Sequence, residues 1–179
     1  PDAKAPECLV FSETQHPRLS YTCEFVFHTV LLSRFRITSS KEDYEAHPGI
    51  KINYSCQTLK GGLEIQPDGL LFEKGIREKV PELIPLDGLF KAFVNNIAQL
   101  TNTMNYDVFA MVFYFISRYE EWQRQEQDEH GRFGVQQSIL FKHKTLHRPV
   151  VDLCTQELKE KLTLLFPNAP WPDTGPKLL

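Results

Sequence analysis

The sequence lacks the patterns that identify several common classes of protein. Its four cysteines form no C-x-x-C pair, which excludes a zinc ribbon and a thioredoxin-type redox motif. It contains no serine nucleophile elbow, phosphate-binding loop or dinucleotide-binding fingerprint. No apolar run reaches the roughly 18 residues that a membrane-spanning helix needs. Internal repeats and low-complexity tracts are also missing. Any function must therefore be inferred from individual side chains and their spacing.

An excess of charge of one sign is missing too. Twenty Lys and Arg stand against 23 Asp and Glu, a net charge of −3. This balance argues against a nucleic-acid footprint and a basic membrane-binding surface, so neither nucleic acid nor a membrane is an expected partner. No signal peptide is visible, and a cytoplasmic location is slightly favoured. Free, buried cysteines are favoured, although two disulfides remain formally open.

The length and the position of the prolines predict the domain organisation. A chain of 179 residues suits one domain, which can bury about 70% of its unfolded surface. The segment P-N-A-P-W-P-D-T-G-P near the end contains four prolines and has the character of a linker. We therefore expect one domain over residues 1–166 and a Pro-rich linker over 167–179, which would lead toward a further part of a larger protein.

Hydrophobic periodicity predicts an α+β or α/β fold, with a small mixed sheet of about four to five short strands packed by about four helices. The expected strands, of which the last three would form a hairpin or meander, are 7–12, 35–39, 50–55, 63–66 and 70–73. The expected helices are 18–33, 86–100, 106–122 and one opened by Pro149. Residues 41–48 are expected to be a loop and 138–141 a short extended piece.

The helix near 106–122 is the predicted centre of the domain. All nine side chains from Val108 to Ile116 are apolar or aromatic, and a helix that is apolar all round is buried on most sides. Asn105 or Asp107 can cap its start. The polar tail that follows brings several ionisable groups to the edge of the core. These candidate binding or clasp residues are Arg118, Glu120, Glu121, Asp128, His130 and Arg132.

The chemistry of this tail favours a structural clasp. Asp128, Glu129 and His130 have metal-ligand side chains, but three adjacent residues rarely converge on one ion, so a solvated loop is favoured. Adjacent glutamates on a helix point about 100° apart, which excludes an acid/base pair of Glu120 with Glu121. We assign no catalytic residue and no metal ligand. Arg118 and Arg132 are expected to pair with Glu120, Glu121 or Asp128, and a buried pair would make Arg132→Ala cost a few kcal/mol.

Two other groups of side chains give weaker signals. His143 and His147 stand four apart, a spacing that would suit zinc on a helix, but the lysines beside His143 and the proline at 149 disfavour such a site. Tyr119, Trp122 and Trp171 are candidates for a surface on which sugars stack.

Three stretches carry a family resemblance. They are Y-D-V-F-A-M-V-F-Y-F-I-S-R-Y-E-E-W at 106–122, D-E-H-G-R-F at 128–133 and H-R-P-V-V-D at 147–152. They resemble the N-terminal region ahead of the catalytic domain in certain large bacterial polysaccharide-deacetylase-like proteins. That region has the patterns F-D-x-F-A-x-x-F-Y-L-x-S-R-Y-E-E-Y, D-x-H-G-R-F and P-x-V-D. Tyr106 and Trp122 here replace the commoner Phe and Tyr, and the match spans about 50 residues.

The resemblance implies a carbohydrate-processing context. The deacetylase chemistry would belong to the following domain, where an Asp-Asp pair and an H-x-x-x-H pair hold a divalent metal that activates water. This chain has no adjacent Asp pair, so no cofactor is expected in it. The expected function is a non-catalytic domain with a structural or substrate-presenting role, its partners being the catalytic domain of the same protein and, as a candidate, a polysaccharide. The alternatives are a metal-dependent hydrolase using Asp128 and His130, and a sugar-binding module using Tyr119, Trp122 and Arg132.

Overall fold

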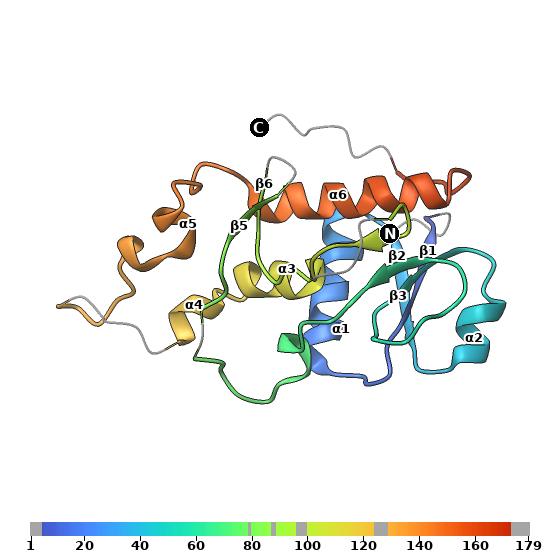
Figure 1. Ribbon diagram of the computed structural model, residues 1–179, viewed down its shortest axis with the longest axis horizontal. Helices are drawn as coiled ribbons and strands as arrows, with labels where there is room; N and C mark the ends of the chain where they lie inside the picture. Colours follow the sequence, from blue (N-terminus) through green and yellow to red (C-terminus); the bar gives the residue numbers. More distant parts are fainter. Residues whose placement is uncertain (1–4, 79, 87–88, 96–99, 124–128, 173–179) are drawn as a thin grey trace.

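A five-stranded parallel sheet forms the centre of the computed structural model, which describes residues 5–78, 80–86, 89–95, 100–123 and 129–172 (Figure 1). The strand order is β2-β1-β3-β4-β7. The strands are β1 (Glu7–Phe11), β2 (Arg34–Thr38), β3 (Ile50–Asn53), β4 (Leu63–Ile65) and β7 (Thr103–Met104). A separate antiparallel pair joins β5 (Ile84–Leu86) to β6 (Leu89–Lys91). The predicted mixed α/β class is confirmed.

Helices surround this sheet and extend away from it. They are α1 (Pro17–Cys23), which continues as a π-helix (Glu24–Val30), α2 (Lys41–Ala46), α3 (Val108–Ile116), α4 (Tyr119–Trp122), α5 (Ile139–Lys142) and α6 (Val150–Leu165). In Figure 1, α6 lies along one side of α3, and α5 lies at the end of the molecule farthest from α2. Within the described ranges, none of the helices has both the length and the apolar character needed to cross a membrane.

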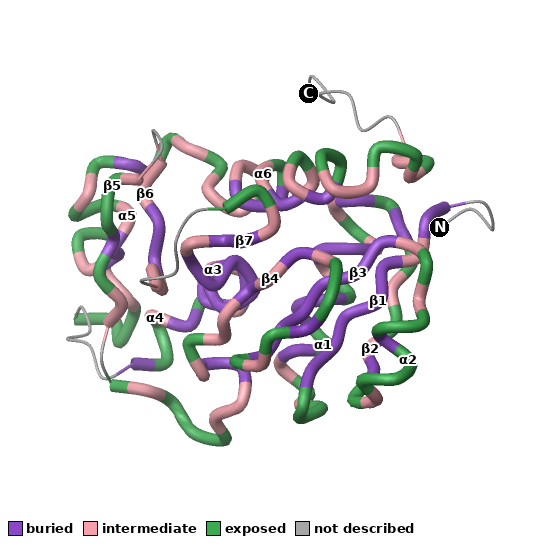
Figure 2. The backbone as a smooth tube through the Cα atoms, turned by 45° about the vertical axis from the view of Figure 1, so that its right-hand side comes forward, coloured by how far each residue is buried: buried purple, intermediate pink, exposed green. Residues whose placement is uncertain are grey.

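The apolar sequence of β1 explains why the sheet has two covered faces. Successive strand side chains point to opposite faces, so a strand with four consecutive apolar residues, Cys8 to Phe11, needs cover on both sides. Cys8 and Val10 face the main core, which contains side chains from α1, α3 and α6. Leu9 and Phe11 face a second, smaller cluster that includes Tyr44 of α2. Figure 2 shows buried backbone running through β1, β3 and α3.

The prediction for residues 41–48 was wrong, because they contain α2 instead of a loop. The Ser40 side chain caps this helix by accepting a hydrogen bond from the Asp43 backbone N–H at 3.0 Å. Tyr44 then anchors the helix, since its ring packs edge-on against Phe11. The short, mostly polar helix was hidden in the sequence because a single buried aromatic side chain gives no visible periodicity.

The predicted meander at 50–73 was also wrong. β3 and β4 pair in parallel, and the expected strand at 70–73 is a 3₁₀ turn over Leu70–Phe72. Leu70 and Leu71 are both buried, a pattern that a helical turn allows and that a strand with one covered face does not. Gly69 has a φ of 106°, and this left-handed conformation starts the turn.

Two further local predictions differ from the structure. The expected helix at 86–100 contains strand β6, and Phe93 has a φ of 57°, which a continuous right-handed helix cannot include. Residues 87–88 and 96–99 of that predicted helix lie outside the described residues. The expected extended piece at 138–141 is the short helix α5.

All four cysteines are free, as the sequence favours. Cys8, Cys23 and Cys154 are buried, and burial raises the pKa of the Cys154 thiol to about 12. Cys56 differs from them because it is exposed, in the connection that follows β3. It is therefore the one thiol of the chain that a water-soluble reagent can reach in the folded state.

Candidate functional site

The predicted central helix is present as α3, and seven consecutive residues from Val108 to Tyr114 are buried. Asp107 is its N-cap, since the side chain accepts a hydrogen bond from the Ala110 backbone N–H at 2.9 Å. The helix ends at Ile116 instead of continuing to residue 122. Arg118 has a φ of 53°, and this left-handed residue separates α3 from α4. The polar tail therefore leaves the core in a new direction.

The carboxylate of Asp107 is wholly buried and joins three parts of the chain. Its Oδ2 accepts hydrogen bonds from the Tyr54 hydroxyl at 2.9 Å and from the Asp68 backbone N–H at 2.8 Å. Burial is the main cause that raises the pKa of Asp107 from 3.8 to about 6, and the three hydrogen bonds oppose this rise. Asp107 thus links the end of β3, the connection after β4 and the start of α3.

Arg77 continues this polar network toward α4. Its guanidinium lies 2.6 Å from a carboxylate oxygen of Asp68 and 2.5 Å from one of Glu73. The Arg77 backbone N–H donates to the Tyr119 hydroxyl at 2.6 Å, and its carbonyl accepts from the Gln123 amide at 2.8 Å. The side chain of Arg77 is therefore held by residues of its own connection, and its two backbone groups are held by the distant segment at α4.

Arg18 of α1 binds the same connection that contains Arg77. Its guanidinium donates to the carbonyls of Leu70 at 2.8 Å and Gly75 at 2.7 Å. It also lies over the rings of Phe113 and Tyr119, with distances of 5.4 and 5.6 Å to the ring centres. The connection over residues 68–77 is consequently fixed to α1, α3 and α4.

The sequence-predicted arginine–carboxylate contact forms at Arg118, but as a surface pair. Arg118 Nη2 lies 2.5 Å from Glu121 Oε1, three residues along the chain, and the Arg118 side chain is 74% exposed. The link between α4 and the following segment comes from Glu120, whose Oε2 accepts a hydrogen bond from the Ile139 backbone N–H at 2.9 Å. Asp128, also predicted for this clasp, lies outside the described residues.

The remaining predicted site residues lie at the surface. His130 Nε2 is 3.4 Å from Glu129 Oε1, and both side chains are largely exposed. Arg132 is exposed as well, so an ion pair at this residue lies at the surface. Within the described ranges, no three His, Cys, Asp or Glu side chains are grouped closely enough to hold a metal ion. The geometry thus offers His130 no set of metal ligands in this part of the chain.

The two histidines do not share a helix face, and the candidate stacking residues differ in how far they are buried. His143 ends α5 and its ring lies 5.4 Å from that of Phe90, whereas His147 lies beyond the end of that helix. Tyr119 is buried and hydrogen-bonded, so it cannot present its ring to a sugar. Trp122, by contrast, is 70% exposed.

Replacing Arg132 with alanine is expected to lower the free energy of unfolding by less than about 1 kcal/mol, because exposed ion pairs contribute little. Urea denaturation at neutral pH measures this. Arg77→Ala is the matched control and should cost more, since that guanidinium contacts two carboxylates and is about a quarter exposed. A loss of several kcal/mol for Arg132→Ala would instead indicate that Arg132 takes part in a buried ion pair.

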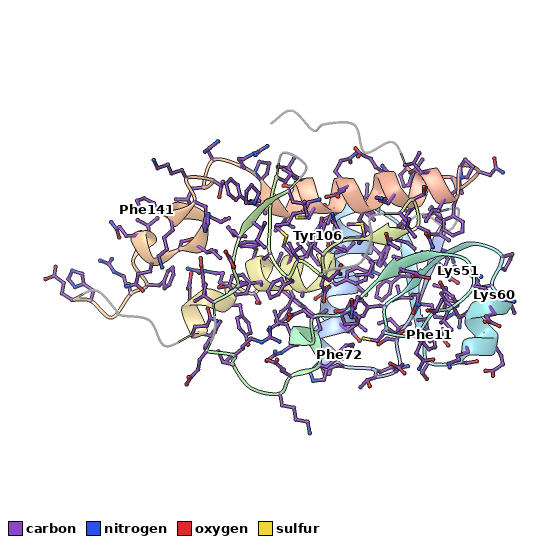
Figure 3. The ribbon with its side chains drawn as sticks, in the orientation of Figure 1. Phe11, Lys51, Lys60, Phe72, Tyr106 and Phe141 are labelled. Carbon is purple, nitrogen blue, oxygen red and sulfur yellow. The ribbon has the colours of Figure 1, made fainter. Side chains whose placement is uncertain are left out.

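A second ion pair, which the sequence did not indicate, is buried between β6 and α6. Lys91 is wholly buried, and its Nζ lies 2.7 Å from Glu157 Oε1 and 4.7 Å from the ring centre of Tyr106. The Tyr106 hydroxyl donates to Glu157 Oε2 at 3.0 Å, and Figure 3 shows Tyr106 just below α6. The single lysine among apolar residues in L-F-K-A-F was the only signal in the sequence.

A basic arm, residues 130–148, extends from the α/β core and includes α5. It contains four Lys or Arg and no Asp or Glu, so with −3 overall the rest of the chain has a net charge of −7. Its exposed apolar side chains are Val135, Phe141 and Leu146. Phe141 lies at the end of the molecule away from Lys51 and Lys60 (Figure 3). An open hollow of about 490 Å³ is lined by Gln136, Phe141, Lys142, Lys144, Leu146 and His147.

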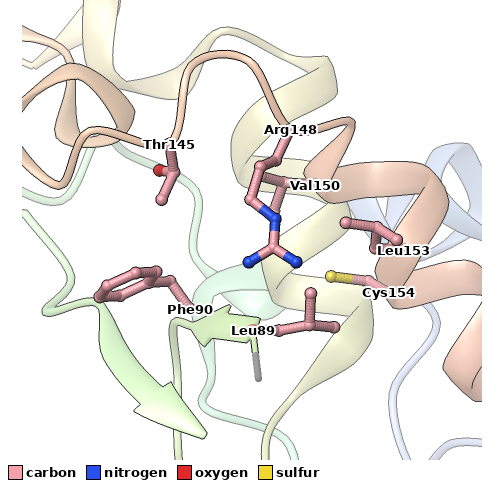
Figure 4. A pocket seen from close by; sticks show the side chains of 7 residues that line it. All are labelled: Leu89, Phe90, Thr145, Arg148, Val150, Leu153 and Cys154. Carbon is pink, nitrogen blue, oxygen red and sulfur yellow. The ribbon is translucent and has the colours of Figure 1, made fainter. Parts of the chain in front are cut away.

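The base of the basic arm packs closely against α6 and β6. A gap of about 10 Å³ is lined by Leu89, Phe90, Thr145, Arg148, Val150, Leu153 and Cys154. The Arg148 guanidinium points into it, toward Leu89 and Cys154 (Figure 4). A space of this size barely admits one water molecule, so it is a packing gap and not a ligand site.

Comparison with known protein families shows which family this chain belongs to. A family model described as a family of unknown function (DUF7033) matches residues 8–167. The chain belongs to this family. The match includes Asp107, the Lys91–Glu157 pair and the basic arm. No curated protein and no solved structure matches the chain.

Proposed function

We propose that this chain is a non-catalytic N-terminal domain of a polysaccharide-deacetylase-like protein, with a structural or substrate-presenting role. The link to deacetylases rests on the motif at 106–122, 128–133 and 147–152. The observation that carries the proposal is that polar groups of this motif are used within the fold. The carboxylate of Asp107 accepts three hydrogen bonds, the Tyr119 hydroxyl accepts one from Arg77, and Glu120 accepts one from Ile139. A motif whose polar groups are bound within the fold stabilises its own domain. In this proposal the deacetylation reaction takes place in a separate catalytic domain.

The basic arm is the face that supports contact with a catalytic domain. Phe141 and Leu146 expose apolar surface, and Lys142 and Lys144 line the same hollow. A partner with an apolar centre and an acidic rim complements this surface, because apolar contacts supply affinity and opposite charges steer the encounter. A divalent metal belongs to the catalytic domain in this proposal, where it would activate the attacking water.

Activity assays separate this proposal from the metal-dependent hydrolase. The isolated chain, supplied with Zn²⁺ or Co²⁺ and acetylated chitooligosaccharides, should release no acetate. The longer protein, read from the same gene and containing the Asp-Asp and H-x-x-x-H motifs, should release it. Release of acetate by the isolated chain, lost in His130→Ala, would instead establish the hydrolase.

Introducing aspartate at Phe141 should weaken association between this chain and the separately expressed catalytic domain by more than about 10-fold, since buried aromatic anchors dominate interfaces. Isothermal titration calorimetry measures the effect. Leu164→Asp is the matched control, because Leu164 is 70% exposed on α6 and outside the basic arm. Equal affinities for the wild type and Phe141→Asp would exclude the basic arm as the docking face.

A sugar-binding module is a second candidate, and the exposure of Trp122 favours it. An indole that is 70% exposed offers a face on which a sugar ring can stack. Titration with oligosaccharides should then change the tryptophan fluorescence of the wild type and not that of Trp122→Phe. An unchanged wild-type spectrum would exclude this role.

A further inference from the structure

We propose that a polar pocket at the carboxyl ends of β3 and β4 binds a small, neutral, polyhydroxylated ligand of the size of one sugar unit. The pocket has a volume of about 170 Å³ and is lined by Asn53, Ser55, Cys56, Gln57, Thr58, Glu64 and Gln66. It holds several water molecules at about 30 Å³ each, and it is smaller than the roughly 300 Å³ at which pockets for drug-sized ligands begin. It shares no residue with the basic arm or with Trp122, so the inference is independent of the proposed function.

The pocket lies next to the point where the strand order reverses, which is between β1 and β3. The chain goes from β1 to β2 on one side and then returns to β3 on the other side of β1. The connection after β1 leads to α1 in the main core, whereas Leu59, in the connection after β3, packs in the second core on the opposite face. Parallel α/β sheets bind ligands where neighbouring connections diverge in this way. Gln57, which lines the pocket, donates a hydrogen bond to Glu13 in the connection after β1, so the pocket adjoins this switch point.

One wall of the pocket is fixed before any ligand arrives. Asn53 is buried, and its amide donates to the Gln57 carbonyl at 2.6 Å. The Ser55 hydroxyl donates to Asn53 Oδ1 at 2.7 Å and accepts from the Gln57 backbone N–H at 3.1 Å. These bonds hold residues 53–57 in one conformation, which reduces the entropy that binding must overcome.

The opposite wall presents polar groups that are available to a ligand. Glu64 and Gln66 stand two residues apart, on the strand β4 and just after it, so they share one face. Neither their side chains nor the Thr58 hydroxyl makes a hydrogen bond or ion pair with another residue of the described ranges. Together they offer a carboxylate, an amide and a hydroxyl, which both donate and accept.

The charge of the lining selects the class of ligand. Glu64 is the single charged side chain that lines the pocket, and no Lys or Arg is among the lining residues. Lys51 lies on the same face of β3 as Asn53. Its ammonium already donates hydrogen bonds to the carbonyls of Tyr44 and Glu45, at 3.2 and 3.4 Å. An anionic ligand would therefore be repelled, whereas a compound rich in hydroxyls can satisfy every available donor and acceptor.

Titration with glucose, N-acetylglucosamine and myo-inositol, followed by ¹H–¹⁵N NMR, tests the pocket. We expect shifts of the backbone amides of residues 56–58 and of the Gln66 side-chain amide, with a Kd on the order of 1 mM for about a dozen non-hydrogen atoms. Ligand should also slow maleimide labelling of Cys56, the exposed cysteine. Glu64→Gln and Thr58→Ala should each weaken binding about fivefold or more, and Gln156→Ala on α6 should not.

Three results would overturn the inference. They are no shift with any of the three compounds at tens of millimolar, shifts confined to residues outside the pocket, and shifts only with the cationic analogue glucosamine. The last would mean an acidic site for amines. The amide spectra of the variants show whether each is folded, so a folding defect cannot imitate a loss of binding. Failure here leaves the docking of the basic arm untouched, and failure of the Phe141→Asp test leaves the pocket untouched.

Discussion

Replacing Asp107 with alanine is expected to lower the free energy of unfolding by about 4 kcal/mol. The change removes an N-cap, which costs about 0.5–2 kcal/mol, and it leaves the Tyr54 hydroxyl and the Asp68 N–H without their acceptor, at about 1–3 kcal/mol each. Urea denaturation at pH 7 measures the loss. Asp152→Ala is the matched control, because Asp152 is exposed in the first turn of α6 and should cost less than about 1 kcal/mol. Equal losses in the two variants would contradict this role for Asp107.

The raised pKa of Asp107 also predicts how stability depends on pH. A carboxyl whose pKa is about 6 when folded and near 3.8 when unfolded holds its proton more tightly in the folded state. Its contribution to stability is therefore largest below pH 4 and is lost as the pH rises through 6. The difference between the two pKa values corresponds to about 3 kcal/mol.

Asp107→Asn isolates this contribution, since asparagine does not titrate. The free energy of unfolding of the wild type, minus that of Asp107→Asn, should increase by about 2.4 kcal/mol between pH 7 and pH 4, because the carboxyl of the unfolded chain is still partly ionised at pH 4. Other titrating groups are common to both proteins and cancel in this difference. A difference that stays constant over this range would show that the pKa of Asp107 is close to its ordinary value.

Replacing Glu157 with alanine is the second large effect, and we expect a loss of about 3 kcal/mol. The substitution leaves the buried ammonium of Lys91 without the carboxylate at 2.7 Å, and breaking a buried pair from one side typically costs about 3–5 kcal/mol. The Tyr106 hydroxyl loses its acceptor as well. The lower end of the range applies because the Glu157 side chain is still 21% exposed. Thermal and urea denaturation both measure the loss.

The double variant Lys91→Met with Glu157→Leu tests the cause. Replacing both charges by apolar side chains of similar volume is often neutral, so most of the lost stability should return. Glu160→Ala, on the same helix and exposed, controls for changes in helix propensity. A double variant as unstable as Glu157→Ala would mean that packing, and not the loss of the Lys91–Glu157 pair, determines the loss.

The sequence alone determined the elements whose signal is local. Nine apolar residues in a row required a buried helix at α3, and Asp107 before them supplied its cap. An apolar β1 required a sheet covered on both faces, and Pro149 correctly marked the start of α6. In each case, the residues that form the element also contain the information that specifies it.

The tertiary structure decided the long-range polar partnerships of the candidate sites. Tyr54 and Asp107 are 53 residues apart, and Lys91 and Glu157 are 66 apart. A buried polar group must find a partner, but the sequence does not say which one, because many pairings satisfy the same requirement. Lys91 was therefore placed on a helix that the structure replaces by a strand.

The polar tail after α3 shows the same division. The sequence correctly located charged groups at the end of a buried helix and predicted that they tie down the following segment. Among the described residues, Glu120 makes such a tie with the backbone of Ile139, and the side chain of Arg118 is largely exposed. The residue types in the sequence determined only that a hydrogen bond of this kind could form. The left-handed turn at Arg118 fixed which side chain could make it, because it sets the direction in which α4 leaves the core.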